Sequence, residues 1–356
     1  MSTVPAPLRS SGTGRTSVLR LGGYSVRLRR RTLAAAVGCL LALAAVAAWS
    51  TSTGTFELAP DRLWATLTGS GTAAEDFVVW TVRLPRLATA VGVGACLGLA
   101  GAIFQTLTRN PLGSPDILGL TQGASVGALA AIVLAGASAA AVTGSAALGA
   151  LGTGLVIHLL TRGSDPSGYR IVLVGIGLAA ILAGVNGYLL TRSDIIDAAR
   201  AVFWLTGDLS GREWGQAATV AAVLAAGGIA TFAIGRGLDA LRLGEAAAAG
   251  LGANVRAVKA TALVSASILT AGGVAVAGPL AFVALAAPHI AARLTGSSRS
   301  LLCAALVGAL IVAAADAAAL YGVDGRQLPT GVVTGVIGGV YLMWLLVTQR
   351  KKGVMP

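Results

Sequence analysis

Charged side chains are scarce in this sequence of 356 residues: Asp, Glu, Lys and Arg together make up 11%, against about 25% in soluble domains. Apolar residues of the AVILMFWYC set reach 55%, and the mean hydropathy is +0.81. A chain of this composition cannot cover its surface with polar groups in water, so most of it requires lipid around it. The composition therefore excludes an ordinary soluble protein and predicts an all-α polytopic membrane protein.

Cysteine and histidine are also scarce, with three and two residues. Cys39, Cys96 and Cys303 lie apart inside apolar runs without metal-ligand spacing, which is typical of buried hydrophobic cysteines. His158 and His289 are too few for a metal cluster, and no Ser/His/Asp or Cys/His arrangement indicates catalysis. We therefore expect no metal site, no bound cofactor and no catalytic site in this chain.

Two glycine patterns imitate nucleotide sites without meeting their requirements. Residues 12–16, GTGRT, lack the lysine and the spacing of a phosphate loop. Residues 175–177, GIG, lie inside an apolar run where no βαβ unit can form. Because the chain has no nucleotide site of its own, an active transporter built on it needs energy from another subunit.

Long apolar runs fill the rest of the chain. A membrane core about 30 Å thick requires roughly 20 apolar residues per helix, and the sequence has about ten such runs. The shorter, amphipathic segment 195–206 is interpreted as a re-entrant or interfacial helix. The predicted spans are 32–50, 85–107, 117–136, 139–160, 171–190, 216–235, 258–277, 280–294, 301–320 and 330–348.

Positive charge exceeds negative charge, with 26 Lys and Arg against 14 Asp and Glu. If both termini are cytoplasmic, most of these cations fall in cytoplasmic segments, as the positive-inside rule requires. The excess then reflects topology and contact with anionic lipid rather than nucleic acid. The arginines before the first span imitate a secretory signal, but the apolar run is long and another span follows it.

Four blocks of sequence resemble one family. The first comprises RLPR at 83–86, GAIFQ at 101–105, RNPLGSPD at 109–116 and GA at 123–124. The second is WLTGDL at 204–209, and the third runs from LGE at 243–245 to LG at 251–252. The fourth comprises AGPLAFVALAAPHI at 277–290, Asp316 and QLPTG at 327–331. On these blocks the chain resembles the FecCD family of ABC-importer permeases, over about residues 33–349.

The resemblance implies a BtuC-like, type II importer permease fold in the bacterial plasma membrane. It divides the chain into a basic cytoplasmic tail at 1–31, a transmembrane permease domain at 32–349 and a cytoplasmic tail at 350–356. The subunit would form half of a translocation pore that works by alternating access. The implied partners are a second permease subunit, two P-loop ATPase subunits that bind ATP and magnesium, and an extracytoplasmic binding lipoprotein.

Departures from the common family pattern indicate the cargo. Ala284, Ala292, Leu320 and Gln327 replace residues frequent elsewhere in the family. Most of these, with GGVY at 338–341, resemble the ferric-enterobactin permeases, which work beside a paralogous permease. A ferric siderophore of the catecholate type and a heterodimeric pore are therefore favoured, with cobalamin or haem as alternative cargo. A stand-alone channel or an intramembrane enzyme is the alternative from another class.

Three arginines are candidates for docking. Arg83 and Arg86 lie at the outer mouth of the second predicted span. The resemblance implies that they meet acidic residues of a binding protein, and we add Arg326 because position 320 lacks the arginine often found there. Interfacial snorkelling of the long side chains is the alternative interpretation.

The segment 236–259 is predicted to be cytoplasmic and amphipathic. The resemblance implies that it forms the coupling helices, which fit a groove on the ATPase, whereas a solvated loop is the alternative. Gly244 and Gly252 would permit the turns of a helical pair. The candidate coupling residues are Leu243, Gly244, Glu245, Ala248, Leu251 and Gly252.

Two further groups are gate or turn candidates. Arg109, Asn110 and Pro111 form a turn at the inner end of the second span, or part of a cytoplasmic gate. Pro288 and His289 lie in a later span, where the histidine is interpreted as packed or as part of the gate. Asp316 lies inside a span, where a carboxylate is a functional candidate, and a cap or a pair with Arg326 is the alternative interpretation. It is not assigned to substrate, because a ferric catecholate is anionic.

Overall fold

The computed structural model describes residues 16–21, 24–161, 168–297, 300–322 and 327–350. Every predicted span coincides with a helix. These helices are α1 (Arg30–Ser52), α4 (Leu84–Thr108), α5 (Leu120–Ala135), α6 (Ala139–Thr161), α7 (Gly168–Arg192), α9 (Trp214–Ala233), α12 (Val255–Ala277), α13 (Val283–Thr295), α14 (Leu301–Tyr321) and α15 (Thr330–Arg350).

Shorter elements connect them. They are α2 (Pro60–Leu67), α3 (Ala73–Asp76), the π-helix η1 (Phe77–Arg83), α8 (Ile195–Thr206), α10 (Gly235–Leu241) and α11 (Glu245–Gly250). An antiparallel hairpin of β1 (Thr16–Leu21) and β2 (Tyr24–Arg29) precedes α1. The tail predicted at 1–31 therefore contains a hairpin that the sequence did not indicate, and α1 begins within it, at Arg30.

By length and composition, seven helices of the described residues can each cross a membrane. One is the continuous run from Ala73 to Thr108, which includes α4, and the others are α1, α6, α7, α9, α12 and α14. The prediction of about ten spans additionally counts α5, α15 and the 13-residue α13. The apolar stretches of α5 and α15, Leu120–Ala135 and Thr330–Leu345, are shorter than the seven candidate spans. Segment 195–206 is the helix α8, whose first turn is capped by the carboxylate of Asp194.

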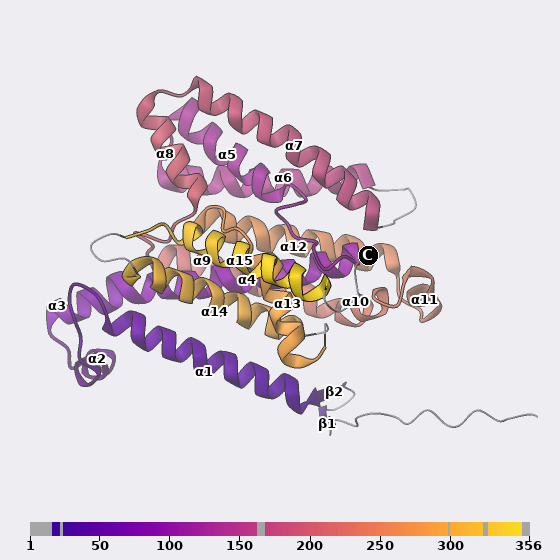
Figure 1. Ribbon diagram of the computed structural model, residues 1–356, viewed down its shortest axis with the longest axis horizontal. Helices are drawn as coiled ribbons and strands as arrows, with labels where there is room; N and C mark the ends of the chain where they lie inside the picture. The colour runs from indigo at the N-terminus through magenta and orange to yellow at the C-terminus, as the bar shows by residue number, and fades with distance from the viewer. Residues whose placement is uncertain (1–15, 22–23, 162–167, 298–299, 323–326, 351–356) are drawn as a thin grey trace, which may run out of the picture.

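Helices α4 and α12 form the centre of the bundle, with most of their apolar length buried. In Figure 1, α9, α13, α14 and α15 lie around them, and α1 runs along the lower edge. Helices α5 to α8 form an upper group that packs on α12 through α5 and α6. A Cβ atom at Gly94 or Gly98 would overlap carbonyl groups of α14. These glycines thus allow backbone-to-backbone packing of α4 on α14, which is how helices associate tightly in lipid.

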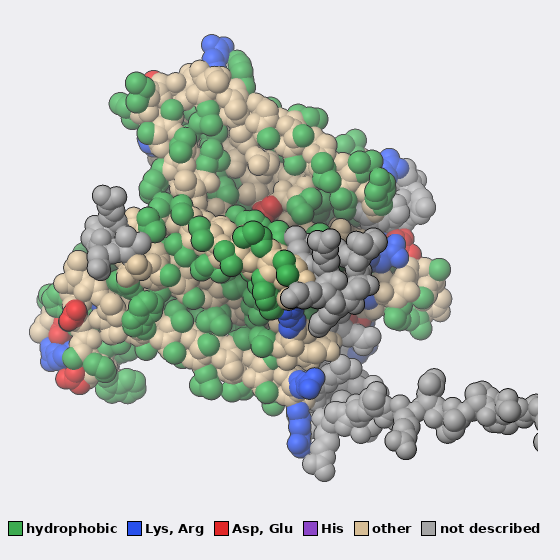
Figure 2. Space-filling model, in the orientation of Figure 1, with side chains coloured by type: hydrophobic (Ala, Val, Ile, Leu, Met, Phe, Trp, Pro, Cys, Tyr) green, Lys and Arg blue, Asp and Glu red, His purple; other side chains and the backbone are tan. Residues whose placement is uncertain are grey.

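Charge is confined mainly to the two ends of the long helices. Figure 2 shows a flank of hydrophobic and backbone atoms, with most of the Lys, Arg, Asp and Glu side chains toward the ends. We call one end, where α4 finishes and α10 and α11 lie, the α10–α11 end. The other end, where α4 begins, is the Arg86 end.

Candidate functional site

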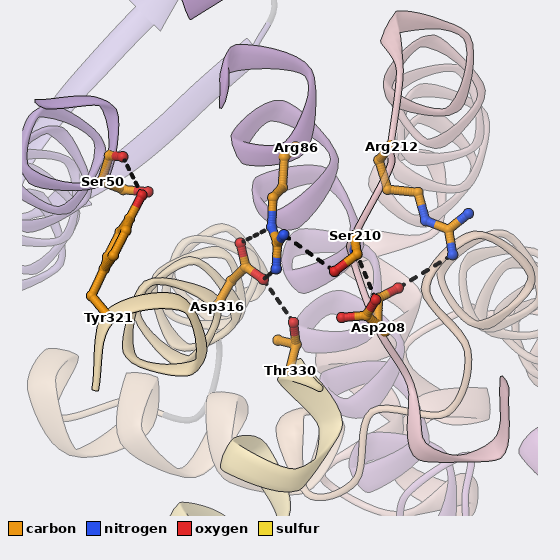
Figure 3. A network of polar contacts seen from close by, with 8 residues as sticks. All are labelled: Ser50, Arg86, Asp208, Ser210, Arg212, Asp316, Tyr321 and Thr330. Carbon is orange, nitrogen blue, oxygen red and sulfur yellow. Dashed lines mark hydrogen bonds and ion pairs between the residues drawn. The ribbon is translucent and has the colours of Figure 1, made fainter. Parts of the chain in front are cut away.

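A buried ion pair forms the centre of the Arg86 end (Figure 3). Arg86, in the first turn of α4, donates from Nε and Nη2 to both carboxylate oxygens of Asp316 in α14, at 2.9 and 2.8 Å. The hydroxyl of Thr330, the first residue of α15, donates to Asp316 Oδ1 at 2.7 Å. The side chains of Arg86 and Asp316 are only 12% and 5% exposed. The pair therefore joins α4, α14 and α15 away from water.

The loop between α8 and α9 extends this network. Arg86 Nη1 donates to Ser210 Oγ at 3.3 Å, and the Ser210 amide donates to Asp208 Oδ2 at 3.0 Å. Arg212 Nη2 donates to the Asp208 carbonyl at 3.3 Å, and desolvation by burial lowers the pKa of Arg212. The Asp208 amide also donates to the carbonyl of Ala277, the last residue of α12. The loop thus ties α12 to the same network.

The guanidinium of Arg86 is turned into the protein, where it neutralises Asp316. Docking by Arg86 stays a prediction. The same finding answers the question of Asp316, whose cationic partner is Arg86. Arg326, the partner that the sequence suggested, lies outside the described residues.

Arg83 is half-buried and clamps the end of α1. Its Nη1 and Nη2 donate to the carbonyls of Thr51 and Phe56, each at 2.6 Å. A Cβ atom at Gly54 would meet the same guanidinium, so glycine is needed where the chain passes it. Docking by Arg83 stays a prediction.

At the opposite end, segment 236–259 forms the predicted helical pair. Gly244 (φ 102°) and Gly252 (φ 82°) adopt backbone conformations that favour glycine, and they bound α11. Leu243 and Leu251 are 61% and 69% exposed, whereas Ala248 is fully buried. Among the candidate coupling residues, Leu243 and Leu251 therefore face outward and Ala248 faces inward. Their role in coupling stays a prediction.

Polar contacts attach this helical pair to the bundle. Arg242 donates from Nε and Nη2 to the hydroxyl oxygen of Thr106 in α4, at 3.3 and 3.0 Å. Glu245 accepts from Lys259 Nζ of α12, and it lies 3.8 Å from Arg109 Nη2. The pair α10 and α11 is thus connected to both central helices.

The two groups of gate or turn candidates meet at this end. Arg109 ends α4 in a left-handed conformation (φ 49°), and Asn110 Oδ1 accepts from the Leu112 amide at 2.9 Å, so the chain turns here. A share in a gate stays a prediction. His289 Nε2 lies 2.9 Å from the Pro111 carbonyl oxygen. Because a carbonyl only accepts, this nitrogen carries the hydrogen. Pro288 lies beside it, inside α13.

These residues surround a cavity of about 360 Å³, which we call the Arg242 cavity. It lies between the end of α4, the turn at Pro111, α10 and α13. Sequence reasoning missed Thr106 and Arg242 as functional residues because they are 136 positions apart in the chain. It missed Lys259 because no motif indicates its contact with Glu245, 14 positions away. The only available signal was their position beside the RNP turn and within or at the edge of segment 236–259.

The part of the chain that the structure describes holds no group of three or more His, Cys, Asp or Glu side chains suited to a metal ion. The fold combines apolar membrane-length helices, an exposed helical pair at one end and buried polar networks at both ends. These features define a polytopic membrane transport subunit.

The family is shown by comparison with known proteins. Residues 42–348 match the FecCD transport family, to which the chain belongs. It is 38% identical to the ferric enterobactin transport system permease protein FepG of Escherichia coli (strain K12), over 89% of this chain and 97% of that protein. It is 35% identical to the probable siderophore transport system permease protein YfhA of Bacillus subtilis (strain 168), over 80% of this chain and 86% of that protein.

A solved structure has the same architecture. The inward-facing structure of a putative metal-chelate type ABC transporter is 28% identical, with a TM-score of 0.79 over 88% of this chain and 98% of that one. Further relatives are named for citrate, hydroxamate and cobalamin import. The chain is thus a permease subunit of an ABC transporter and not an enzyme, and ATP hydrolysis belongs to a partner ATPase.

Proposed function

We propose that this chain forms half of the translocation pore of an importer for ferric siderophores, driven by two ATPase subunits that dock on α10 and α11. The observation that carries the proposal is the exposed pair Leu243 and Leu251. These leucines lie on a helical pair that is hydrogen-bonded to α4 and ion-paired to α12. An apolar surface beyond the membrane-length helices favours a protein groove as its partner.

The α10–α11 end is assigned to the cytoplasm, together with both termini. The distribution of Lys and Arg over the loops supports this orientation. It places α10 and α11 on the side where ATP is available, and it places Arg83 and Arg86 outside. A bacterial inner membrane follows for a multi-pass importer of this family.

We infer a route by which closure of the ATPase subunits changes the packing at the Arg86 end. Displacement of α10 acts on α4 through Arg242 and Thr106, and displacement of α11 acts on α12 through Glu245 and Lys259. Both central helices run to the Arg86 end, where Arg86 and Asp208 connect them to α14 and α15. Rigid central helices with polar joints at both ends are suited to switching between two packings.

A second, paralogous permease is the proposed partner in the pore, and an extracytoplasmic lipoprotein delivers the cargo. Helices α7 and α8 leave large apolar residues uncovered, among them Ile195 and Ile196 at 89% and 73% exposed. Arg83 and Arg326 remain proposed docking residues for that lipoprotein. Arg86 contributes to docking by holding the first turn of α4 in place.

A catecholate-type ferric siderophore is the favoured cargo, because the relative at 38% identity is named for ferric enterobactin. Cobalamin is the alternative, since a cobalamin import permease is also a relative, at 32% identity. The cargo is tested with the assembled transporter in proteoliposomes, by ATPase stimulation with binding protein loaded with each candidate. Stimulation by ferric catecholate is expected, and stimulation only by cobalamin would reassign the cargo.

The coupling role is tested in the same assay with Leu251→Glu. A charge on this exposed surface should abolish cargo-stimulated ATPase activity while the complex stays folded, because it opposes apolar docking. Leu251→Met, which conserves volume and polarity, is the matched control and should behave as wild type. Full stimulation of the Leu251→Glu transporter would exclude α11 as a coupling helix.

A further inference from the structure

The short helix α2 exposes large apolar side chains at the Arg86 end. Leu63 and Thr66 are buried on the face that packs against the protein. Going round the helix from this face, Leu67 comes next and then Trp64, and both are exposed, Trp64 by 69%. Asp61 is exposed beyond Trp64. Helix α2 thus has an uncovered apolar side next to an uncovered polar side, which is the pattern of a helix that lies in a membrane interface.

Aromatic side chains extend this surface onto the neighbouring π-helix η1. Phe77 and Trp80, three positions apart in η1, are exposed by 60% and 43%. Trp80 Nε1 lies 3.5 Å from the carbonyl oxygen of Thr66 in α2, so the two elements adjoin. We call the following residues the α2 aromatic patch: Phe56, Trp64, Leu67, Phe77 and Trp80. Tryptophan concentrates where membrane meets water, because its ring is apolar and its N–H seeks a polar partner.

The end of α1 fixes the depth of α2. The 23 residues of α1 rise by about 34 Å, close to the thickness of the hydrocarbon core, so Ser52 at its end lies near the membrane boundary. The Leu58 amide donates to the Ser52 carbonyl at 3.0 Å, so the connecting chain folds back onto the end of α1. Helix α2 begins two positions later, at Pro60. It therefore lies at the level of the membrane boundary and not in the water beyond it.

The side of the bundle on which α2 lies selects lipid as its partner. In Figure 1, α2 lies by the end of α1, across the bundle from α7 and α8, where the second permease is proposed. Helix α1 buries almost none of its apolar length, so its flank faces lipid, and α2 contacts α1 directly. Figure 2 shows hydrophobic side chains where α2 lies, with charged side chains beside them. The α2 aromatic patch thus continues the lipid-facing surface of α1.

We propose that α2 is an interfacial anchor whose aromatic patch inserts among the lipid headgroups and upper acyl chains at the Arg86 end. Arg62 of α2 donates to both carboxylate oxygens of Glu75 in α3, at 2.9 and 2.7 Å. Helix α3 runs without interruption into η1 and α4. An inserted α2 therefore holds the start of α4 at the membrane surface and places Arg83, at the end of η1, in the headgroup layer. Only the assignment to the outer leaflet rests on the proposed function; the insertion does not.

The depth of α2 is measured by power-saturation electron paramagnetic resonance of nitroxide labels on introduced cysteines. The assembled transporter, in nanodiscs of phosphatidylcholine and phosphatidylglycerol, carries Trp64→Cys, Leu67→Cys or Asp61→Cys. Cysteines of this chain are buried, and the transporter without an introduced cysteine gives the background. Oxygen, which concentrates among acyl chains, should relax the Trp64→Cys and Leu67→Cys labels more than a water-soluble nickel chelate does. Nickel should dominate at Asp61→Cys, the matched control on the same helix.

The other outcomes would overturn the proposal. Dominance of nickel at all three positions would place α2 in water, and weak relaxation by both reagents would show that a protein covers it. Equal dominance of oxygen at Asp61→Cys would exclude an oriented helix. The Leu67→Cys label tests the insertion even if Trp64→Cys does not fold. The measurement needs neither ATP nor cargo, so its failure is distinguishable from a failure of the proposed transport function.

A second set of variants tests the contribution of the indole ring. In the Leu67→Cys transporter, Trp64→Ser should lower the ratio of oxygen to nickel relaxation, because α2 loses its largest inserted side chain. Trp64→Phe keeps an aromatic ring and is the matched control, so it should retain most of the ratio. An unchanged ratio in the Trp64→Ser transporter would contradict anchoring by the patch.

Discussion

The ion pair of Arg86 and Asp316 permits a quantitative prediction. Replacing Arg86 with Gln removes the guanidinium and leaves the Asp316 carboxylate buried, with the hydroxyl of Thr330 as a remaining donor. Breaking a buried pair by removing one partner costs about 3–5 kcal/mol, because an uncompensated charge stays in a medium of low dielectric constant. We expect the free energy of unfolding to fall by about this amount.

The double variant Arg86→Met/Asp316→Leu separates the charge effect from the packing effect. It removes both charges and keeps apolar volume, so it should recover most of the loss. Unfolding is followed in mixed micelles with increasing denaturing detergent. The cycle of wild type, Arg86→Met, Asp316→Leu and the double variant gives the coupling energy. Arg200→Gln is the control, because Arg200 is 50% exposed and its partner Asp197 lies 3.6 Å away. An exposed pair of this kind contributes below about 1 kcal/mol.

The result would also discriminate between the two roles of Arg86. If Arg86 were only an open docking group, Arg86→Gln would weaken capture of the binding protein and leave unfolding unchanged. Unaltered stability in Arg86→Gln, or no recovery in the double variant, would refute the structural role.

Three further changes have defined outcomes. Gly101→Ala should lower the free energy of unfolding by about 1–3 kcal/mol, because the added Cβ would overlap the Ala284 carbonyl of α13. Gly177→Ala is the control and should leave stability unchanged, because its Cβ would meet nothing within 4 Å. Gly252→Ala should lower the free energy of unfolding by about 1–2 kcal/mol, because alanine is strained at φ 82°. It should also reduce cargo-stimulated ATPase activity, and normal stimulation would contradict the need for glycine at the end of α11. Desolvation by burial raises the pKa of Asp116, against the lowering effect of its hydrogen bond from Thr121. The folded state therefore binds this proton more tightly, and stability should fall as the pH rises from the ordinary aspartate value to the raised one. Asp116→Asn should make stability less dependent on pH in this range. An unchanged pH profile of unfolding would contradict the role of Asp116.

The spans were predictable because lipid imposes length and composition on each helix. Helix α14, for example, coincides with the predicted span 301–320 to within a residue. The turn at Asn110 and the helical pair around Gly244 followed from local conformational preferences of proline, asparagine and glycine. In each of these cases, the determining interactions lie within a few residues of one another.

Contacts between distant residues were not predictable from one sequence. The RLPR motif places Arg86 at a helix end, but nothing in its spacing indicates that the side chain turns inward to Asp316, 230 residues away. Ala248 and Leu251 are separated by less than one helical turn, yet one is buried and the other exposed. The joint of Arg242 and Thr106 spans 136 residues and depends on the tertiary arrangement of α4 and α10.

Uptake into proteoliposomes tests the central claim most directly. Vesicles containing this chain with its second permease and ATPase subunits, supplied with loaded binding protein, should accumulate radiolabelled ferric siderophore only when ATP is present. The same vesicles without the ATPase subunits should accumulate none. Uphill accumulation without the ATPase would contradict the account, because the chain would then carry its own source of energy.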